Sequence, residues 1–154
     1  MDPIELKPGD QAPAFKGLNQ HGEEVSLQDF KGKKVILYFY PKDNTPGCTT
    51  EACNFRDNYQ SLQAEGLEVI GVSTDSQQSH QKFIAKYDLP FTLLADEDKA
   101  IVQAYGVYGE KKFMGKKYMG TTRRTFLIDE QGIITHIINK VDNKNASQQV
   151  RELI

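Results

Sequence analysis

The sequence predicts an α/β fold in which a mixed central sheet carries helices on both faces. Short apolar runs alternate with segments of helical periodicity along most of the chain, which is the pattern of parallel strands joined by crossover helices. Near the C-terminus, two further apolar runs are separated only by the turn Glu130-Gln131-Gly132. That spacing predicts an antiparallel pair within the same sheet.

The first half of the chain predicts a small hairpin, a buried strand and a long helix. Extended segments flank a turn at residues 19–22, which favours an N-terminal β-hairpin. The six apolar or aromatic residues Val35–Tyr40 predict a buried strand, and Pro41 ends it. A helix follows from about Thr45 to Ala64, and Gly66 stops it. The buried face predicted for this helix consists of Cys48, Ala52, Phe55, Tyr59 and Leu62.

The second half continues the alternation of strands and helices. Strands are predicted at Leu67–Ser73, Phe91–Ala95, Arg123–Asp129 and Ile133–Ile138, and helices at Ser76–Tyr87, at Asp98–Tyr105 and from Asn145 onward. Between them, the segment Gly106–Gly120 is rich in Gly, Lys and Tyr. We expect this segment to be a loop or a loose hairpin.

The composition is that of an ordinary globular chain, with 38% hydrophobic and 26% charged residues among 154. No internal repeat or linker divides it, so a single domain over residues 1–154 is expected. The net charge of −2 does not indicate nucleic-acid or membrane binding. The first residues lack the apolar core of a signal peptide, and no apolar run approaches the length of a membrane span. We therefore expect a cytoplasmic protein whose two cysteines are kept reduced.

The stretch from Pro41 to Cys53 carries the strongest functional indication. Thr45 and Pro46 predict a helix start, because threonine can cap a helix and proline is favoured at its first position. Cys48 then lies in the first turn, where free N–H groups and the helix dipole favour an anion. A thiol in this position ionises more readily, and the thiolate is the reactive form. We therefore expect Cys48 to be a nucleophile that substrate can reach.

These residues resemble the active-site signature of the peroxiredoxins, in which a threonine follows a proline by four residues and the attacking cysteine follows three later. Pro41, Thr45 and Cys48 match it, and Cys53 narrows the resemblance to the bacterioferritin-comigratory, or Q-type, branch. The resemblance extends from about Pro8 to the end of the chain and implies a thioredoxin-like fold. It implies a thiol-dependent peroxidase for hydrogen peroxide and organic hydroperoxides, recycled by thioredoxin or a similar dithiol protein.

Cys53 is expected to resolve the sulfenic acid formed on Cys48 by condensing with it to a disulfide. Two residues five apart in a helix have Cα atoms roughly 8.5 Å apart, whereas a disulfide requires less than about 7 Å. The first turns of the helix must therefore unwind before the bridge can form. The alternative is that Cys53 is an inert core thiol.

Further site residues follow from the same resemblance. Thr45 would contact the peroxide through its hydroxyl, and capping the helix is its other possible role. Pro41 would pack over the sulfur, and ending the strand is its alternative role. The backbone N–H groups of Gly47 and Cys48 would donate hydrogen bonds to the peroxide oxygens, and Gly47 leaves room for that approach.

An arginine is expected near the sulfur, to balance the thiolate and the charge on the displaced oxygen. Arg123 and Arg124 are the candidates, and they point to opposite faces of a strand. The family pattern places its arginine three residues before an aromatic residue of the strand, as Arg123 precedes Phe126, so we choose Arg123. Glu51 matches a glutamate common in this branch. We leave it outside the catalytic set, because complementing the helix dipole is enough to explain it.

Other functions find less support in the sequence. Structural zinc needs four closely spaced ligands, whereas His21, His80 and His136 are scattered and are interpreted as surface or packing residues. Neither a metal nor a cofactor is therefore expected. A disulfide oxidoreductase would need a Cys-x-x-Cys pair, which this sequence lacks. The alternative function is that of a non-catalytic thioredoxin-fold binding or chaperone module.

Two further expectations concern partners. The lysines of segment 111–117 are interpreted as part of a solvated loop, and guidance of a reductant or of an anionic hydroperoxide is the alternative. Because a resolving cysteine in the same chain removes the need for a second subunit, we expect a monomer. No nucleic acid and no membrane is expected among the partners.

Overall fold

Strand β3 (Lys34–Phe39) lies at the centre of the sheet. In the computed structural model, which describes residues 5–154, it pairs in parallel with β4 (Leu67–Ser73) and antiparallel with β8 (Arg124–Ile128). Five of its six residues are buried, as expected of a strand that is covered on both faces. The predicted strand Val35–Tyr40 is thus confirmed, although the observed strand begins and ends one residue earlier.

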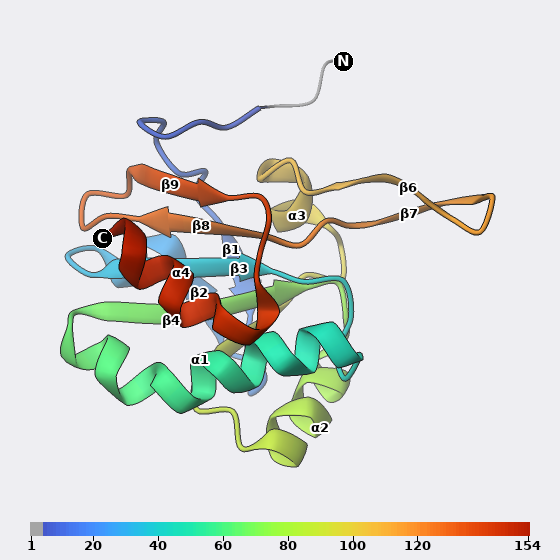
Figure 1. Ribbon diagram of the computed structural model, residues 1–154, viewed down its shortest axis with the longest axis horizontal. Coiled ribbons are helices and arrows are strands. Elements are labelled where there is room, and N and C mark those ends of the chain that lie inside the picture. The colour runs from blue at the N-terminus through green and yellow to red at the C-terminus, as the bar shows by residue number, and fades with distance from the viewer. Residues whose placement is uncertain (1–4) are drawn as a thin grey trace.

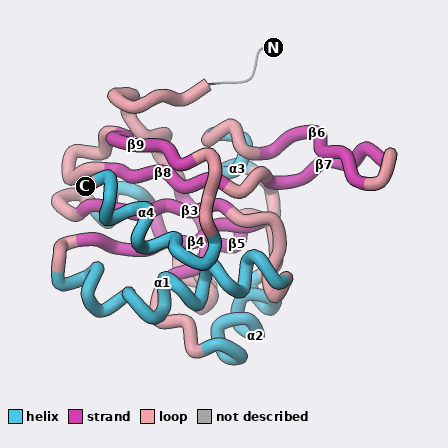
Figure 2. Tube along the Cα trace, in the orientation of Figure 1, coloured by secondary structure: helices cyan, strands magenta, loops and turns pink. Residues whose placement is uncertain are grey.

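The other strands extend the sheet on both sides of β3. The order is β2-β1-β5-β4-β3-β8-β9, and Figure 2 shows β4, β3, β8 and β9 side by side. The outer strands are β1 (Lys16–Leu18), β2 (Glu24–Ser26), β5 (Thr92–Ala95) and β9 (Ile134–Ile138). The pairs β1–β2 and β8–β9 are antiparallel. Both predicted antiparallel pairs, including the N-terminal hairpin, are therefore present.

Helices cover both faces of this sheet, as predicted (Figure 1). The helices are α1 (Pro46–Ala64), α2 (Gln77–Tyr87), α3 (Ala100–Ala104) and α4 (Ala146–Leu153), with 3-10 turns η1 (Leu27–Phe30) and η2 (Asn143–Asn145). The sequence overestimated α3, which is shorter than the expected 98–105. Within residues 5–154, no helix combines the length and apolarity needed to cross a bilayer.

Alternation along β3 divides the apolar interior into two layers. Ile36 and Tyr38 face a layer to which α1 contributes Phe55 and Leu62. Val35, Leu37 and Phe39 face the opposite layer, which contains the buried residues Ile101, Val102, Tyr105 and Phe126. The central strand thereby anchors α1 to one face of the sheet, and α1 carries both cysteines.

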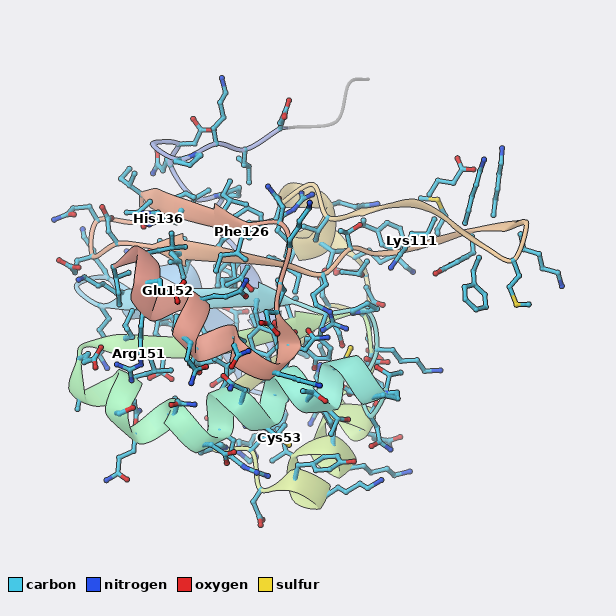
Figure 3. All side chains as sticks on the ribbon, viewed as in Figure 1. Cys53, Lys111, Phe126, His136, Arg151 and Glu152 are labelled. Atoms are coloured by element: carbon cyan, nitrogen blue, oxygen red, sulfur yellow. The ribbon has the colours of Figure 1, made fainter. Side chains whose placement is uncertain are left out.

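The segment predicted as a loop or loose hairpin is a regular hairpin. Strands β6 (Tyr108–Phe113) and β7 (Lys116–Thr121) pair antiparallel over six residue pairs and form a sheet of their own. Figure 1 shows this hairpin projecting away from the rest of the molecule. Lysine and aromatic side chains can occupy strand positions there because neither face is packed against another element over the outer half (Figure 3).

Gly71, in the middle of β4, leaves room for a buried ring. A Cβ atom at this position would lie 2.7 Å from Leu93 Cδ2 and 2.8 Å from Tyr38 Cζ, both in the core. We expect Gly71→Ala to lower the free energy of unfolding by about 1–3 kcal/mol, as measured by urea denaturation. Gly109→Ala is the control, because a Cβ there has no neighbour within 4 Å. Equal losses in the two variants would contradict the packing argument.

Candidate active site

Cys48 occupies the third position of α1, as the sequence predicted. Pro46 is the first helical residue, and the Thr49 N–H donates to the Thr45 carbonyl at 2.8 Å. The N–H groups of Gly47 and Cys48 precede that bond, so they have no acceptor within the helix. Two backbone donors without a helical acceptor therefore lie in the same turn as the Cys48 sulfur.

Arg123 is the arginine that reaches this sulfur. It comes just before β8, and its Nη2 donates to Cys48 Sγ at 3.1 Å. Burial lowers the pKa of Arg123, but the charges of Glu51 and Cys48 outweigh burial and raise it. Arg124 instead lines a pocket with Tyr105 and Phe126. The guanidinium of Arg123 is thus a positive charge held beside the Cys48 sulfur.

Glu51 is the main site residue that the sequence reasoning left out. Its side chain is fully buried, and its Oε1 accepts from Arg123 Nη1 at 2.7 Å. Its Oε2 has no hydrogen-bond partner among the described residues. Burial raises the pKa of Glu51 to about 7, although the charge of Arg123 and its hydrogen bond act to lower it. The helix-dipole explanation is therefore insufficient, because Glu51 also fixes the guanidinium.

Cys48 is more enclosed than the sequence suggested. Its exposure is only 1%, so the expectation of a sulfur open to substrate is wrong for this conformation. The sulfur lies under the Arg123 side chain, which is 21% exposed and is the solvent-facing part of the cluster. In this conformation Cys48 therefore offers almost no surface to a hydroperoxide.

Gly47 allows two side chains to approach the start of α1. A Cβ at this position would lie 3.0 Å from Asn143 Nδ2 and 3.2 Å from Arg123 Nη2. The sequence reasoning did not single out Asn143, which comes from η2 close to the C-terminus. Its Oδ1 is buried without a partner in the described part of the chain. A third segment of the chain therefore borders the site.

Thr45 and Pro41 lie in the loop between β3 and α1, and both are half-buried. The Thr45 hydroxyl donates to the Lys42 carbonyl at 2.9 Å and makes no capping hydrogen bond to the helix. Capping by this side chain is therefore excluded. Because the hydroxyl proton is already used, the Thr45 oxygen remains available as an acceptor.

A buried polar network fixes the same loop to α2. His80 Nδ1 lies 2.7 Å from Asp43 Oδ2, and its Nε2 lies 2.9 Å from the Leu94 carbonyl. The hydroxyls of Tyr40 and Ser79 also donate to Asp43. Burial would lower the pKa of His80, but the hydrogen bond and charge of Asp43 outweigh it and raise the pKa. His80 is therefore neither a surface residue nor a simple packing residue.

Cys53 lies five residues after Cys48 on the same continuous helix, and both are free thiols. Cys53 is half-buried, and Figure 3 shows it on α1. Among residues 5–154, no group of three or more His, Cys, Asp or Glu side chains is placed to hold a metal ion. The site therefore consists of two thiols on one helix, and the Arg123 guanidinium contacts the first of them, Cys48.

Comparison with known proteins agrees with this arrangement. The AhpC/TSA family model matches residues 8–137. The peroxiredoxin Bcp of Escherichia coli K12 is 49% identical over 140 residues, which are 91% of this chain and 90% of that protein. The chain belongs to the AhpC/TSA family. Within this family it is a peroxiredoxin of the Bcp, or Q-type, branch, and therefore a thiol peroxidase that acts on peroxide and is recycled by a thiol reductant.

Solved peroxiredoxin structures have the same fold. A cysteine-to-serine mutant of PrxQ from Xylella fastidiosa superposes with a TM-score of 0.90 at 30% identity, covering 97% of this chain and 95% of the other. The bacterioferritin comigratory protein of Xanthomonas campestris, studied for alkyl peroxide reduction, superposes with a TM-score of 0.84 at 34% identity. The match covers 90% of this chain and 89% of that one. The predicted thioredoxin-like fold of this peroxiredoxin is thereby confirmed.

The buried Glu51 carboxyl makes stability depend on pH. Between its ordinary pKa of 4.5 and about 7, the folded chain keeps a proton that the unfolded chain has released. The free energy of unfolding should therefore fall as pH rises through this window. Because Glu51→Gln removes this group, the stability of the wild type relative to the variant should fall from pH 4.5 to 7 and then level off.

This pH dependence is measured by urea denaturation of both proteins across that range. Glu97→Gln, which changes an exposed carboxylate, is the control. A constant difference between the wild type and Glu51→Gln at every pH would contradict the assigned titration.

Proposed function

We propose that Cys48 attacks the hydroperoxide and that Cys53 resolves the oxidised product within the same chain. The observation that carries this proposal is the 3.1 Å contact between Arg123 Nη2 and Cys48 Sγ at the first turn of α1. A positive charge and free backbone donors meet there at one sulfur. A binding or chaperone module, the alternative function, has no use for such a pairing.

The electrons and atoms balance over three steps. The Cys48 thiolate attacks one peroxide oxygen and the O–O bond breaks, so that the other oxygen leaves as hydroxide or alkoxide and takes up a proton. Cys48 is then a sulfenic acid. The Cys53 thiolate attacks that sulfur, and the hydroxyl group leaves as water when it gains a proton. A dithiol reductant then supplies two electrons and two protons to restore both thiols.

The neighbouring groups have complementary roles in the first step. Arg123 balances the thiolate and then the negative charge on the departing oxygen. The free N–H groups of Gly47 and Cys48 donate to the peroxide oxygens. The Thr45 hydroxyl, which already donates to the Lys42 carbonyl, accepts a hydrogen bond from the peroxide O–H group. Pro41 limits the access of water from the strand side of the loop.

Disulfide formation requires α1 to open at its N-terminal end. The helix is continuous over both cysteines, and their Cα atoms are roughly 8.5 Å apart by helical geometry. Asn54, next to Cys53, fastens this region to the C-terminal segment. Its Nδ2 donates to the Lys144 carbonyl at 2.8 Å, and its Oδ1 accepts from the Ser147 N–H at 2.8 Å. Opening the helix breaks or weakens these hydrogen bonds. Asn54 therefore opposes formation of the Cys48–Cys53 disulfide.

The reductant and the state of the chain belong to the same proposal. We infer thioredoxin or a similar dithiol protein as the reductant, because the disulfide becomes accessible when α1 opens. An intramolecular resolving cysteine supports a monomer. The two free cysteines support a reducing, cytoplasmic location. The sheet, which takes strands from both ends of the chain, supports one domain over residues 1–154.

Replacement of each cysteine separates the two chemical steps. Cys48→Ser should abolish peroxide consumption, because no thiolate remains at the first turn of α1. Cys53→Ser should complete one turnover and then accumulate over-oxidised Cys48. The measurement is a thioredoxin-coupled peroxidase assay, with mass spectrometry of wild type after one equivalent of peroxide. A disulfide between two chains, in place of a Cys48–Cys53 link, would refute the resolving role of Cys53.

Removal of the Asn54 side chain should speed disulfide formation. Asn54→Ala loses hydrogen bonds to η2 and α4, which should lower the cost of local opening by about 1–2 kcal/mol. The Cys48–Cys53 disulfide should then form about 5- to 30-fold faster after a peroxide pulse, and over-oxidation at high peroxide should decrease.

The rate is followed by acid quenching and mass spectrometry. Gln60→Ala, at an exposed position on the same helix, is the matched control. A lower global stability of Asn54→Ala with an unchanged rate of disulfide formation would show that the contact is merely structural.

A further inference from the structure

The outer part of the β6–β7 hairpin, residues 111–119, exposes large apolar side chains that the proposed chemistry does not use. We call this segment the hairpin tip. Met114 is 88% exposed, Phe113 67% and Met119 58%, the three highest values among the exposed large apolar residues of the described chain. Tyr118 is also exposed, at 47%. Such a cluster on a projecting element indicates an interaction site.

Met114 also has an unusual backbone conformation. It forms a two-residue turn with Gly115, and the φ angles are 52° and 79°. Turns with two positive φ values favour Asn-Gly, and an ordinary side chain in the first position is strained. Because Met114 is almost fully exposed, packing within the chain does not compensate for this strain. The turn is therefore strained at Met114, and an apolar side chain occupies the outermost point of the hairpin.

The hairpin tip is basic as well as apolar, although the whole chain has a net charge of −2. The hairpin tip carries four lysines: Lys111, Lys112, Lys116 and Lys117. The nearest acidic side chain of the hairpin, Glu110, pairs with Lys117 at 3.6 Å. Phe113 lies opposite Lys116 and Lys111 opposite Tyr118, so aromatic and basic side chains share one face. Figure 3 shows Lys111 on the projecting hairpin.

The hairpin is connected directly to the active site. Strand β7 ends at Thr121, and Arg123, which contacts Cys48, follows two residues later. Arg123 therefore follows the base of the hairpin, whereas the hairpin tip lies at the other end of β7 (Figure 1). The hairpin and the peroxidase site form one continuous segment of the chain.

We propose that the hairpin tip binds the surface of an anionic lipid bilayer. Lysines are attracted to anionic headgroups, and exposed Phe, Met and Tyr side chains partition into the interface below them. A bilayer can enclose a convex tip from all sides, whereas a protein partner would need a matching groove. A nucleic acid would satisfy the lysines but would leave Met114 and Met119 in water. Like charges on both strands also oppose self-pairing of the hairpin.

This docking has a consequence for the substrate, which rests on the proposed function. Hydroperoxides of lipid acyl chains are present at such a surface, and docking through the hairpin tip would hold the protein there, with Arg123 at the base of the docked hairpin. The preferred organic substrate is then a hydroperoxide carried by the bilayer. The expectation that no membrane is a partner followed from composition, which does not reveal that the lysines and apolar residues share one projecting tip.

The test uses the full-length reduced protein and sedimentation with vesicles. Vesicles of phosphatidylcholine alone are compared with vesicles that also contain phosphatidylglycerol, at low and high salt. Wild type should sediment with the anionic vesicles only, and less at high salt. Met114→Asn should lower the vesicle-binding constant by about tenfold. The hairpin should be preserved, because Asn-Gly suits this turn. The double variant Lys116→Gln, Lys117→Gln should have a similar effect.

The controls separate this proposal from the peroxidase proposal. Leu153→Asn removes an exposed apolar side chain elsewhere and should leave vesicle binding unchanged. Vesicle binding is measured without peroxide, so failure of the chemistry cannot imitate failure of docking. With turnover, the ratio of the rate on a phospholipid hydroperoxide to the rate on hydrogen peroxide should fall about tenfold in Met114→Asn.

Three results would overturn the proposal. The first is wild-type protein that stays in the supernatant with anionic vesicles at low salt. The second is binding that is equal in wild type, Met114→Asn and the lysine double variant. The third is retention of the wild type by a single-stranded RNA oligonucleotide but not by vesicles.

Discussion

The ion pair between Arg123 and Glu51 is the constraint on which the active site depends. A carboxylate as fully buried as Glu51 is costly unless a positive charge compensates it, and Arg123 provides that charge at 2.7 Å. In return, Glu51 fixes the guanidinium so that its other nitrogen faces Cys48. The sulfur therefore meets a preorganised positive charge, which need not be recruited from solvent during the reaction.

Sheet register determines where this pair forms. Phe39 at the end of β3 lies opposite Arg124, the first residue of β8. Arg123 is therefore level with the end of β3, where the chain turns through Pro41 towards α1. A shift of one residue would send Arg123 to the other face of the sheet and leave Glu51 without its partner. The central strands thus place the charge of Arg123 beside Cys48 as well as forming the core.

The start of α1 is held on three sides, although the proposed reaction requires it to open. Arg123 contacts it from just before β8, the Asp43–His80 network fixes the preceding loop, and Asn54 fastens its third turn to the C-terminal segment. These contacts stabilise the closed, continuous helix, and they oppose the opening that the proposed disulfide requires. None of these contacts involves a residue of β6 or β7. In the proposal above, the hairpin can therefore contact a surface while the helix opens.

The sequence by itself determined the order of strands and helices, the position of Cys48 in the first turn, and the choice of Arg123 over Arg124. The first two follow from local periodicity and helix-start residues, and the third follows from the resemblance to the family's arginine pattern. Tertiary structure alone decided the rest: the burial of Glu51, the double hydrogen bonding of His80, the approach of Asn143 to Gly47, and the enclosure of Cys48. The reason is distance along the chain, since the Arg123 contacts join residues 72 and 75 positions apart. Local patterns cannot report such contacts, because they exist only when the register of β3 and β8 is set.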